Sequence, residues 1–124
     1  MKIPKFEAQT EWVKPTEFPD LRKVDEIAID LETKDPDLIK KGSGAVIGNG
    51  EVIGIAVATK HYKGYFPIGH EGGGNMDKKR VLSWFKDILE APSTKVFHNA
   101  MYDVCWIRAM GFKINGDIVC TMIA

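Results

Sequence analysis

The chain has 124 residues, of which 44% are hydrophobic and 27% are charged, and its 17 basic and 17 acidic side chains cancel. This length supports one compact domain and leaves no room for two. No apolar run approaches the ~18 residues that a membrane span needs, and the first residues lack the apolar core of a secretory signal. Cytoplasmic residence and no membrane partner are therefore expected, while a neutral charge leaves nucleic-acid binding open.

Residues 1–23 are predicted to form an extended N-terminal arm. Three prolines in this stretch remove backbone donors and disfavour helix at the residue before each of them. Trp12 and Phe18 lie between the prolines, and we expect such aromatic side chains to hold the arm against the domain. A disordered leader is the alternative. The domain itself is expected to span residues 24–124.

Three strands are predicted in the first half of this domain, at 26–33, 51–59 and 64–69. In the first strand, apolar and other residues alternate with the two-residue period of a half-buried strand. One face carries Ile27, Ile29 and Leu31, and the other carries Ala28, Asp30 and Glu32. Short connections and turn residues between the later segments favour an antiparallel meander.

The second half alternates helices and strands. Residues 77–90 have the apolar stripe of an amphipathic helix, with Asp77 as its N-cap. A short buried strand at 95–99, a helix at 100–110 and a further strand before the end of the chain follow. This order predicts the α/β class, a mixed sheet flanked by helices. Cys105 and Cys120 match no metal spacing and are expected to be reduced core residues.

Asp30 and Glu32 are two residues apart on one strand, so their carboxylates project from the same face with Cα atoms ~6–7 Å apart. Like charges that lose hydration repel each other, and a divalent cation between them would offset both costs. Oxygen ligands favour Mg²⁺ or Mn²⁺ over Zn²⁺. From the spacing alone, a metal site and a solvated strand end explain these residues equally well.

A second cluster of polar residues lies where the strand at 95–99 becomes a helix. If Asn99 caps that helix, Asp103 falls in its first turn, where the helix dipole favours an ionised carboxylate. Tyr102 could then stack on a base or bond a phosphate. The alternative is a capped helix with a favourable acid and an ordinary core tyrosine.

Taken together, the two clusters resemble the 3′–5′ proofreading exonuclease domain of family A DNA polymerases, and phage-type members most closely. Asp-x-Glu stands on the first strand, and Asn-x-x-Tyr-Asp stands at a later strand-to-helix turn. The resemblance runs from about residue 12 to the end of the chain, through the segments IAIDLET, VIGIAVAT, YFPIGHEGGGN, VFHNAMYD and TMIA.

This resemblance implies a ribonuclease H-like fold and a site in which four carboxylates hold two divalent metals, Mg²⁺ or Mn²⁺. It implies catalytic and metal-binding roles for Asp30, Glu32 and Asp103. Asp30 would bridge both metals, and the other two acids would each hold one. Contacts to the DNA end are implied for Thr33, Asn99 and Tyr102. The implied substrate is the 3′ end of single-stranded DNA, in a bacterial or phage-infected cell, with a polymerase domain expected C-terminal to this one.

The family's third motif, a Tyr or His four residues before the fourth carboxylate, is expected beyond the TMIA segment. Asp117 comes too early for this role and has Lys113 where the Tyr or His would stand. Residues 24–124 are therefore expected to be a partial domain that alone binds metal weakly and cleaves DNA slowly or not at all. A non-catalytic DNA-binding or scaffolding module of the same fold, and an RNA exonuclease, are the alternatives.

Several other features are interpreted as structural. The glycine-rich segments GSGAVIGNG and HEGGGN match no phosphate-binding motif and are expected to be turns. The three histidines are too far apart in sequence to suggest a metal site, and His98 is expected to be a satisfied residue at a sheet end. Trp84 and Trp106 are expected in the core.

Overall fold

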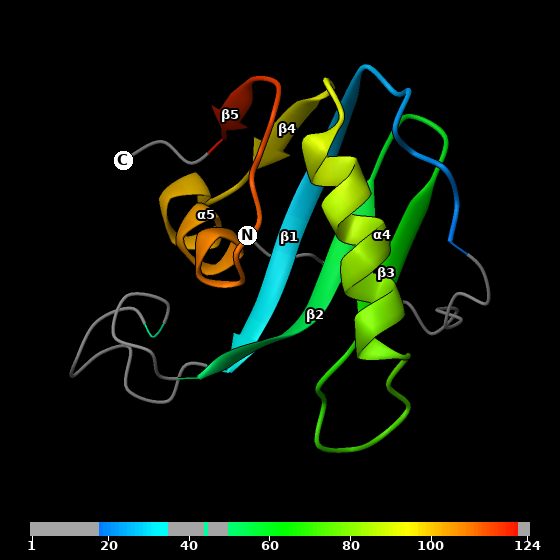
Figure 1. Cartoon of the computed structure of the whole chain (residues 1–124), viewed down its shortest axis with the longest axis vertical. Helices are drawn as coiled ribbons and strands as arrows, with labels where there is room; N and C mark the ends of the chain where they lie inside the picture. Colours follow the sequence, from blue (N-terminus) through cyan, green and yellow to red (C-terminus); the bar gives the residue numbers. More distant parts are fainter. Residues whose placement is uncertain (1–17, 35–43, 45–49, 122–124) are drawn as a thin grey trace.

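The computed structural model describes residues 18–34, 44 and 50–121 of the chain. Its strands form one sheet in the order β3-β2-β1-β4-β5, and helices α4 and α5 interrupt the strand sequence (Figure 1). No helix in these ranges is long and apolar enough to cross a membrane. The elements are β1 (Glu26–Lys34), β2 (Glu51–Ala58), β3 (Lys63–Pro67), α4 (Lys78–Glu90), β4 (Thr94–Phe97), α5 (Ala100–Ala109) and β5 (Ile118–Cys120).

The sheet is mixed. Strand β2 pairs antiparallel with both β1 and β3, which confirms the predicted meander. Strand β4 pairs parallel with β1 on one side and with β5 on the other. Parallel neighbours need a crossover connection, and α4 and α5 lie in these crossovers. The result is the α/β mixed sheet that the sequence predicts, and it agrees with a ribonuclease H-like fold.

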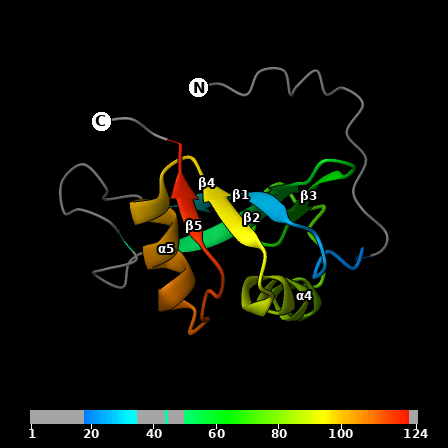
Figure 2. The ribbon, with the colours of Figure 1, turned by 90° about the horizontal axis from the view of Figure 1, so that it is seen from above.

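Both helices cover the same face of the sheet, as Figure 2 shows. The alternation predicted for the first strand explains this arrangement, because Ile27, Ile29 and Leu31 are buried while Ala28, Asp30 and Glu32 are exposed. Helix α4 contributes the stripe expected of it, Val81, Phe85, Ile88 and Leu89. The opposite face of β1, which carries the acids, has no helix over it in the described part of the chain (Figure 2).

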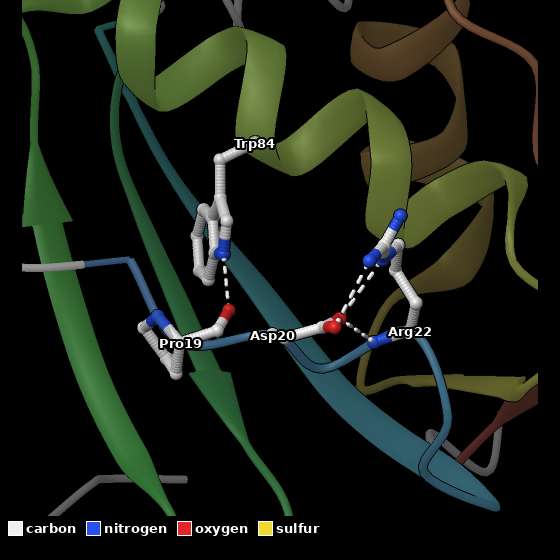
Figure 3. A network of polar contacts seen from close by, with 4 residues as sticks. All are labelled: Pro19, Asp20, Arg22 and Trp84. Atoms are coloured by element: carbon white, nitrogen blue, oxygen red, sulfur yellow. Dashed lines mark hydrogen bonds and ion pairs between the residues drawn. The ribbon is translucent and has the colours of Figure 1, made fainter.

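The segment before β1 is held against α4 and β3. Phe18 lies 6.0 Å from Phe66 and 5.7 Å from Trp84 between ring centroids, and the Trp84 indole donates to the backbone oxygen of Pro19 at 2.7 Å (Figure 3). Phe18 thus anchors this segment as predicted, and Trp84 packs on the core. The rest of the predicted arm, residues 1–17 with Trp12, lies outside the described residues.

The structure corrects the interpretation of the cysteines. Both are free, but Cys105 is only half-buried and Cys120 is exposed. Cys120 is exposed because β5 lies at the edge of the sheet, where all three of its residues are exposed. Cys105 is not among the buried residues of α5, which are Asp103, Trp106 and Ile107. The predicted strand at 95–99 is also shorter, because β4 ends at Phe97. His98 and Asn99 instead form the turn into α5.

Lys95 is a feature that the sequence analysis did not predict. It occupies an inward-facing position of β4 and is completely buried. Its ammonium group donates to the backbone oxygens of Ala91, Ser93 and Asn115, which matches the three N–H donors of a lysine to three acceptors. Burial lowers the pKa of Lys95. The side chain ties the end of α4 to the segment that leads into β5.

Candidate functional site

Strand β1 presents Asp30 and Glu32 on the uncovered face of the sheet. In the β1–β2 register Asp30 lies opposite Ala56 and Glu32 lies opposite Gly54, so small residues flank both acids. Asp30 is exposed as a residue, yet protein atoms displace part of the water around its carboxylate, and this burial raises its pKa. His98 opposes this shift, and the negative charge of Glu32 adds to it.

Helix α5 begins where β4 ends, one strand away from these acids. Asn99 is its N-cap, as predicted, because its side chain accepts a hydrogen bond from the Tyr102 amide at 3.4 Å. The Asn99 carbonyl accepts the first intrahelical bond, from the Asp103 amide at 3.0 Å. Asp103 therefore falls in the first turn of α5, where the helix dipole favours negative charge.

The side chain of Asp103 is buried and reaches β1. Only 3% of the residue is exposed, and its carboxylate accepts a hydrogen bond from the backbone amide of Leu31. Leu31 lies beyond the last β1–β4 pair, Ile29 with Phe97. The carboxylate thus contacts the β1 backbone where β4 no longer pairs with it. Burial raises the pKa of Asp103 to about 7; the charge of Asp30 also raises it, and the Leu31 amide lowers it.

The residues predicted to contact a DNA end lie close to these acids, at the carboxyl end of β1 and the start of α5. The hydroxyl groups of Thr33 and Tyr102 are 2.9 Å apart and share a hydrogen bond, which joins the end of β1 to the first turn of α5. Asn99, Tyr102 and Asp103 all belong to the start of α5, and Thr33 follows the two acids of β1. The structure therefore brings all six predicted site residues to one end of the sheet, where β1 and β4 end and α5 begins.

The turn between β4 and α5 is also tied to β5. The Cys120 thiol accepts a hydrogen bond from the Ala100 amide at 3.4 Å and donates to the His98 carbonyl at 3.5 Å. The His98 imidazole lies 3.4 Å from the Thr121 hydroxyl. His98 is thus a hydrogen-bonded residue at a sheet end, as expected, and its ring also influences the charge of Asp30.

Glu32 makes a contact that was not predicted from the sequence. The Tyr65 hydroxyl donates to Glu32 Oε1 at 3.0 Å and contacts His70 Nε2. Tyr65 comes from β3, two strands away from Glu32, and His70 from the loop that follows β3. A signal was present, because an antiparallel meander brings alternate residues of β3 to the face that carries the acids. Only the register shows which residue reaches Glu32.

The chemistry of these side chains fits a divalent cation. Asp30 interacts electrostatically with both Glu32 and Asp103, and a cation among like charges would offset their repulsion and lost hydration. Among the residues that the structure describes, no three His, Cys, Asp or Glu side chains are close enough together to hold a metal ion. Mg²⁺ commonly keeps several waters and uses one or two carboxylates together with substrate phosphates, so pairs of these acids suffice as protein ligands.

The fold and these side chains define an α/β protein with a carboxylate site toward the carboxyl end of its central strand, β1. The family model of the 3′–5′ exonuclease matches residues 16–124, and the chain belongs to this family. The chain is also 41% identical over 116 residues to a protein of Pseudomonas phage M6 named DNA-directed DNA polymerase. That match covers 86% of this chain but only 17% of the phage protein.

Proposed function

We propose that this chain is the 3′–5′ proofreading exonuclease domain of a phage-type DNA polymerase, which hydrolyses the phosphodiester bond at the 3′ end of single-stranded DNA. The observation that carries the proposal is that Asp30 interacts electrostatically with Glu32 on its own strand and with Asp103 at the start of α5, in a chain of the exonuclease family. The name of the phage relative, and the 17% of its length that this chain matches, support a place within a longer polymerase. We expect the polymerase domain to be C-terminal to this one. The cytoplasm of a bacterial or phage-infected cell is the corresponding location.

In this proposal Asp30, Glu32 and Asp103 hold Mg²⁺ or Mn²⁺. When bound, two such ions would supply an activated water and stabilise the charge on the attacking and leaving oxygens. Asp30 is the acid that would contact both ions, because it interacts with both Glu32 and Asp103. The buried Asp103 carboxyl, with its raised pKa, gains most from a nearby cation, which would favour its ionised form.

The DNA end would be held by Thr33, Tyr102 and Asn99. The paired hydroxyls of Thr33 and Tyr102 offer a donor and an acceptor to the terminal nucleotide beside the acids. Asn99 uses its oxygen to cap α5 and retains an NH₂ group that can donate to a phosphate. Its capping role also fixes the first turn that carries the other residues.

A non-catalytic DNA-binding module of the same fold is the second candidate. It is favoured by the finding that, over the described ranges, no three potential ligands are close enough to hold a metal on their own. The two candidates differ in one respect that can be measured, which is hydrolysis that depends on these acids.

The test is a cleavage assay with a 5′-labelled single-stranded oligonucleotide, with the chain at stoichiometric concentration, in Mn²⁺ or in EDTA. We expect slow shortening from the 3′ end in Mn²⁺ alone. Asp30→Asn should reduce the rate at least about 100-fold, because bound metals contribute several kcal/mol and each ~1.4 kcal/mol is tenfold in rate. Asp117→Asn, which replaces an exposed acid outside the site, is the matched control.

Equal cleavage by wild type and Asp30→Asn would contradict the proposed site. Oligonucleotide binding that is the same in Mn²⁺, in EDTA and in Asp30→Asn, with no cleavage even in prolonged incubation, would instead support the non-catalytic module.

A further inference from the structure

The carboxylate of Glu32 is held by a chain of side-chain contacts. The Tyr65 hydroxyl donates to Glu32 Oε1 at 3.0 Å, and the same hydroxyl lies 2.5 Å from His70 Nε2. A phenol has one hydrogen to donate and an ionised carboxylate can only accept. The hydrogen of Tyr65 therefore goes to Glu32, and His70 must donate its own Nε2–H to the Tyr65 oxygen.

The sheet is shaped to let Tyr65 reach Glu32. Tyr65 pairs with Ala56 in the β2–β3 register, whereas the partner of Glu32 in the β1–β2 register is Gly54. The Tyr65 ring therefore leans along the strands, from the level of Ala56 to that of Gly54. A Cβ atom on Gly54 would lie 1.7 Å from the Tyr65 hydroxyl oxygen. Only glycine at this position leaves the ring its place beside Glu32.

The loop after β3 fixes His70 in turn. Its backbone amide donates to Asn75 Oδ1 at 2.8 Å, and Asn75 Nδ2 donates back to the His70 carbonyl at 2.9 Å. Gly73 and Gly74 have φ values of +88° and +74°, which allow the loop to turn back on itself. At the base of the same loop, Glu71 pairs with Lys34 at the end of β1.

From these contacts we propose that Tyr65 and His70 are positioning residues that hold Glu32 Oε1 and thereby orient this carboxylate toward the metal. The inference rests on the metal site of the proposed function. A glutamate on an exposed strand face has several rotatable bonds, and binding a cation would otherwise require ordering them. The HEGGGN segment, which the sequence suggested was merely a turn, is then part of the support for the site.

Outer partners of metal ligands typically contribute 10–100-fold to metal affinity, so we expect Tyr65→Phe to weaken Mn²⁺ binding by about tenfold. Mn²⁺ affinity of the whole chain can be followed by calorimetry, or by paramagnetic broadening of NMR signals where binding is weak. Tyr62→Phe is the matched control, because it removes the same hydroxyl from a half-buried tyrosine that is not part of this contact chain.

Two comparisons separate positioning from a general effect on structure. In a Glu32→Gln background, Tyr65→Phe should cause no further loss, since its effect passes through the Glu32 carboxylate. His70→Gln keeps an N–H donor and should retain affinity, whereas His70→Ala should lose it about as Tyr65→Phe does. These His70 variants also keep the test decisive should Tyr65→Phe not fold.

The outcomes distinguish this inference from the proposed function. If Asp30→Asn abolishes Mn²⁺ binding while Tyr65→Phe binds as the wild type does, the positioning role is wrong and the metal site stands. The positioning role is also wrong if Tyr65→Phe costs as much in the Glu32→Gln background as in the wild type. If wild type and Asp30→Asn bind Mn²⁺ equally, or neither binds it, the metal site itself is wrong and the inference falls with it.

Discussion

At the residue scale, Asp103 combines features that rarely occur together. It is an acid with 3% of its surface exposed, and it lies in the first turn of α5. Its carboxylate accepts a hydrogen bond from the backbone amide of Leu31 in β1. The helix dipole and the Leu31 amide favour its charged form, but burial and Asp30 outweigh them and raise its pKa to about 7. Without a cation, the ionised form of this residue therefore destabilises the fold near neutral pH.

The pH dependence of stability follows from this shift. The pKa of Asp103 rises from 3.8 to about 7 on folding, so the folded state keeps a proton that the unfolded state releases between about pH 4 and pH 7. Its contribution to stability is complete below pH 4 and is lost as the pH rises to 7. The loss is at most about 4 kcal/mol, at ~1.4 kcal/mol per pH unit.

We therefore predict that Asp103→Asn, measured in EDTA, is more stable than the wild type at pH 8 by up to a few kcal/mol. The advantage should shrink toward zero at pH 4, where both side chains are neutral. Urea unfolding at pH 4, 6 and 8 measures the difference, with Asp117→Asn as the control for the loss of an exposed acid. A difference that is constant across this range would mean that the Asp103 carboxyl titrates normally.

At the element scale, α4 shows how local sequence rules determine a helix. Asp77 accepts hydrogen bonds from the backbone amides of Lys79 and Arg80, at 3.0 and 3.3 Å, and so satisfies donors that the first turn leaves unpaired. The apolar stripe of the helix then packs on the buried face of β1. Cap and stripe were both predicted, because each depends only on residues within the helix or next to it.

Removing this cap should have a measurable cost. We predict that Asp77→Ala lowers the free energy of unfolding by about 1 kcal/mol, since Ala cannot accept the two amide hydrogen bonds. Thermal or urea unfolding measures the change. Ser83→Ala, at an exposed position within the same helix, should be neutral or slightly stabilising. An equal loss in both variants would show that the cap contributes nothing specific.

Elements whose character depends on neighbours far apart in the sequence were predicted less well. Cys120 in β5 was expected in the core, but the edge position of this strand leaves it exposed. Lysine is rarely fully buried, and only the chain segments folded around Lys95 supply the three carbonyl partners of its ammonium group. The contact of Tyr65 with Glu32 depends on the register of three strands and on Gly54. Local sequence patterns do not encode such contacts.

At the scale of the whole molecule, the fold separates a covered face from an uncovered one. Both helices pack on the apolar face of the sheet, and the carboxylates of β1 remain on the other (Figure 2). Asp103 lies at the start of α5, just after β4 ends, and its carboxylate interacts with that of Asp30 on β1. Acids from two elements are thus brought together where the β1–β4 pairing ends. The parallel order β1-β4-β5 makes this possible, since it places the start of α5 beside the end of β1.

Divalent metal is proposed to bind at Asp30, Glu32 and Asp103, and locating Mn²⁺ by anomalous diffraction in crystals of the chain would test this site. We predict an anomalous peak about 2 Å from a carboxylate oxygen of Asp30, with Glu32 or Asp103 as a further ligand. Mn²⁺ found only at other acids, or none at saturating concentration, would rule out the site and leave these carboxylates a structural role.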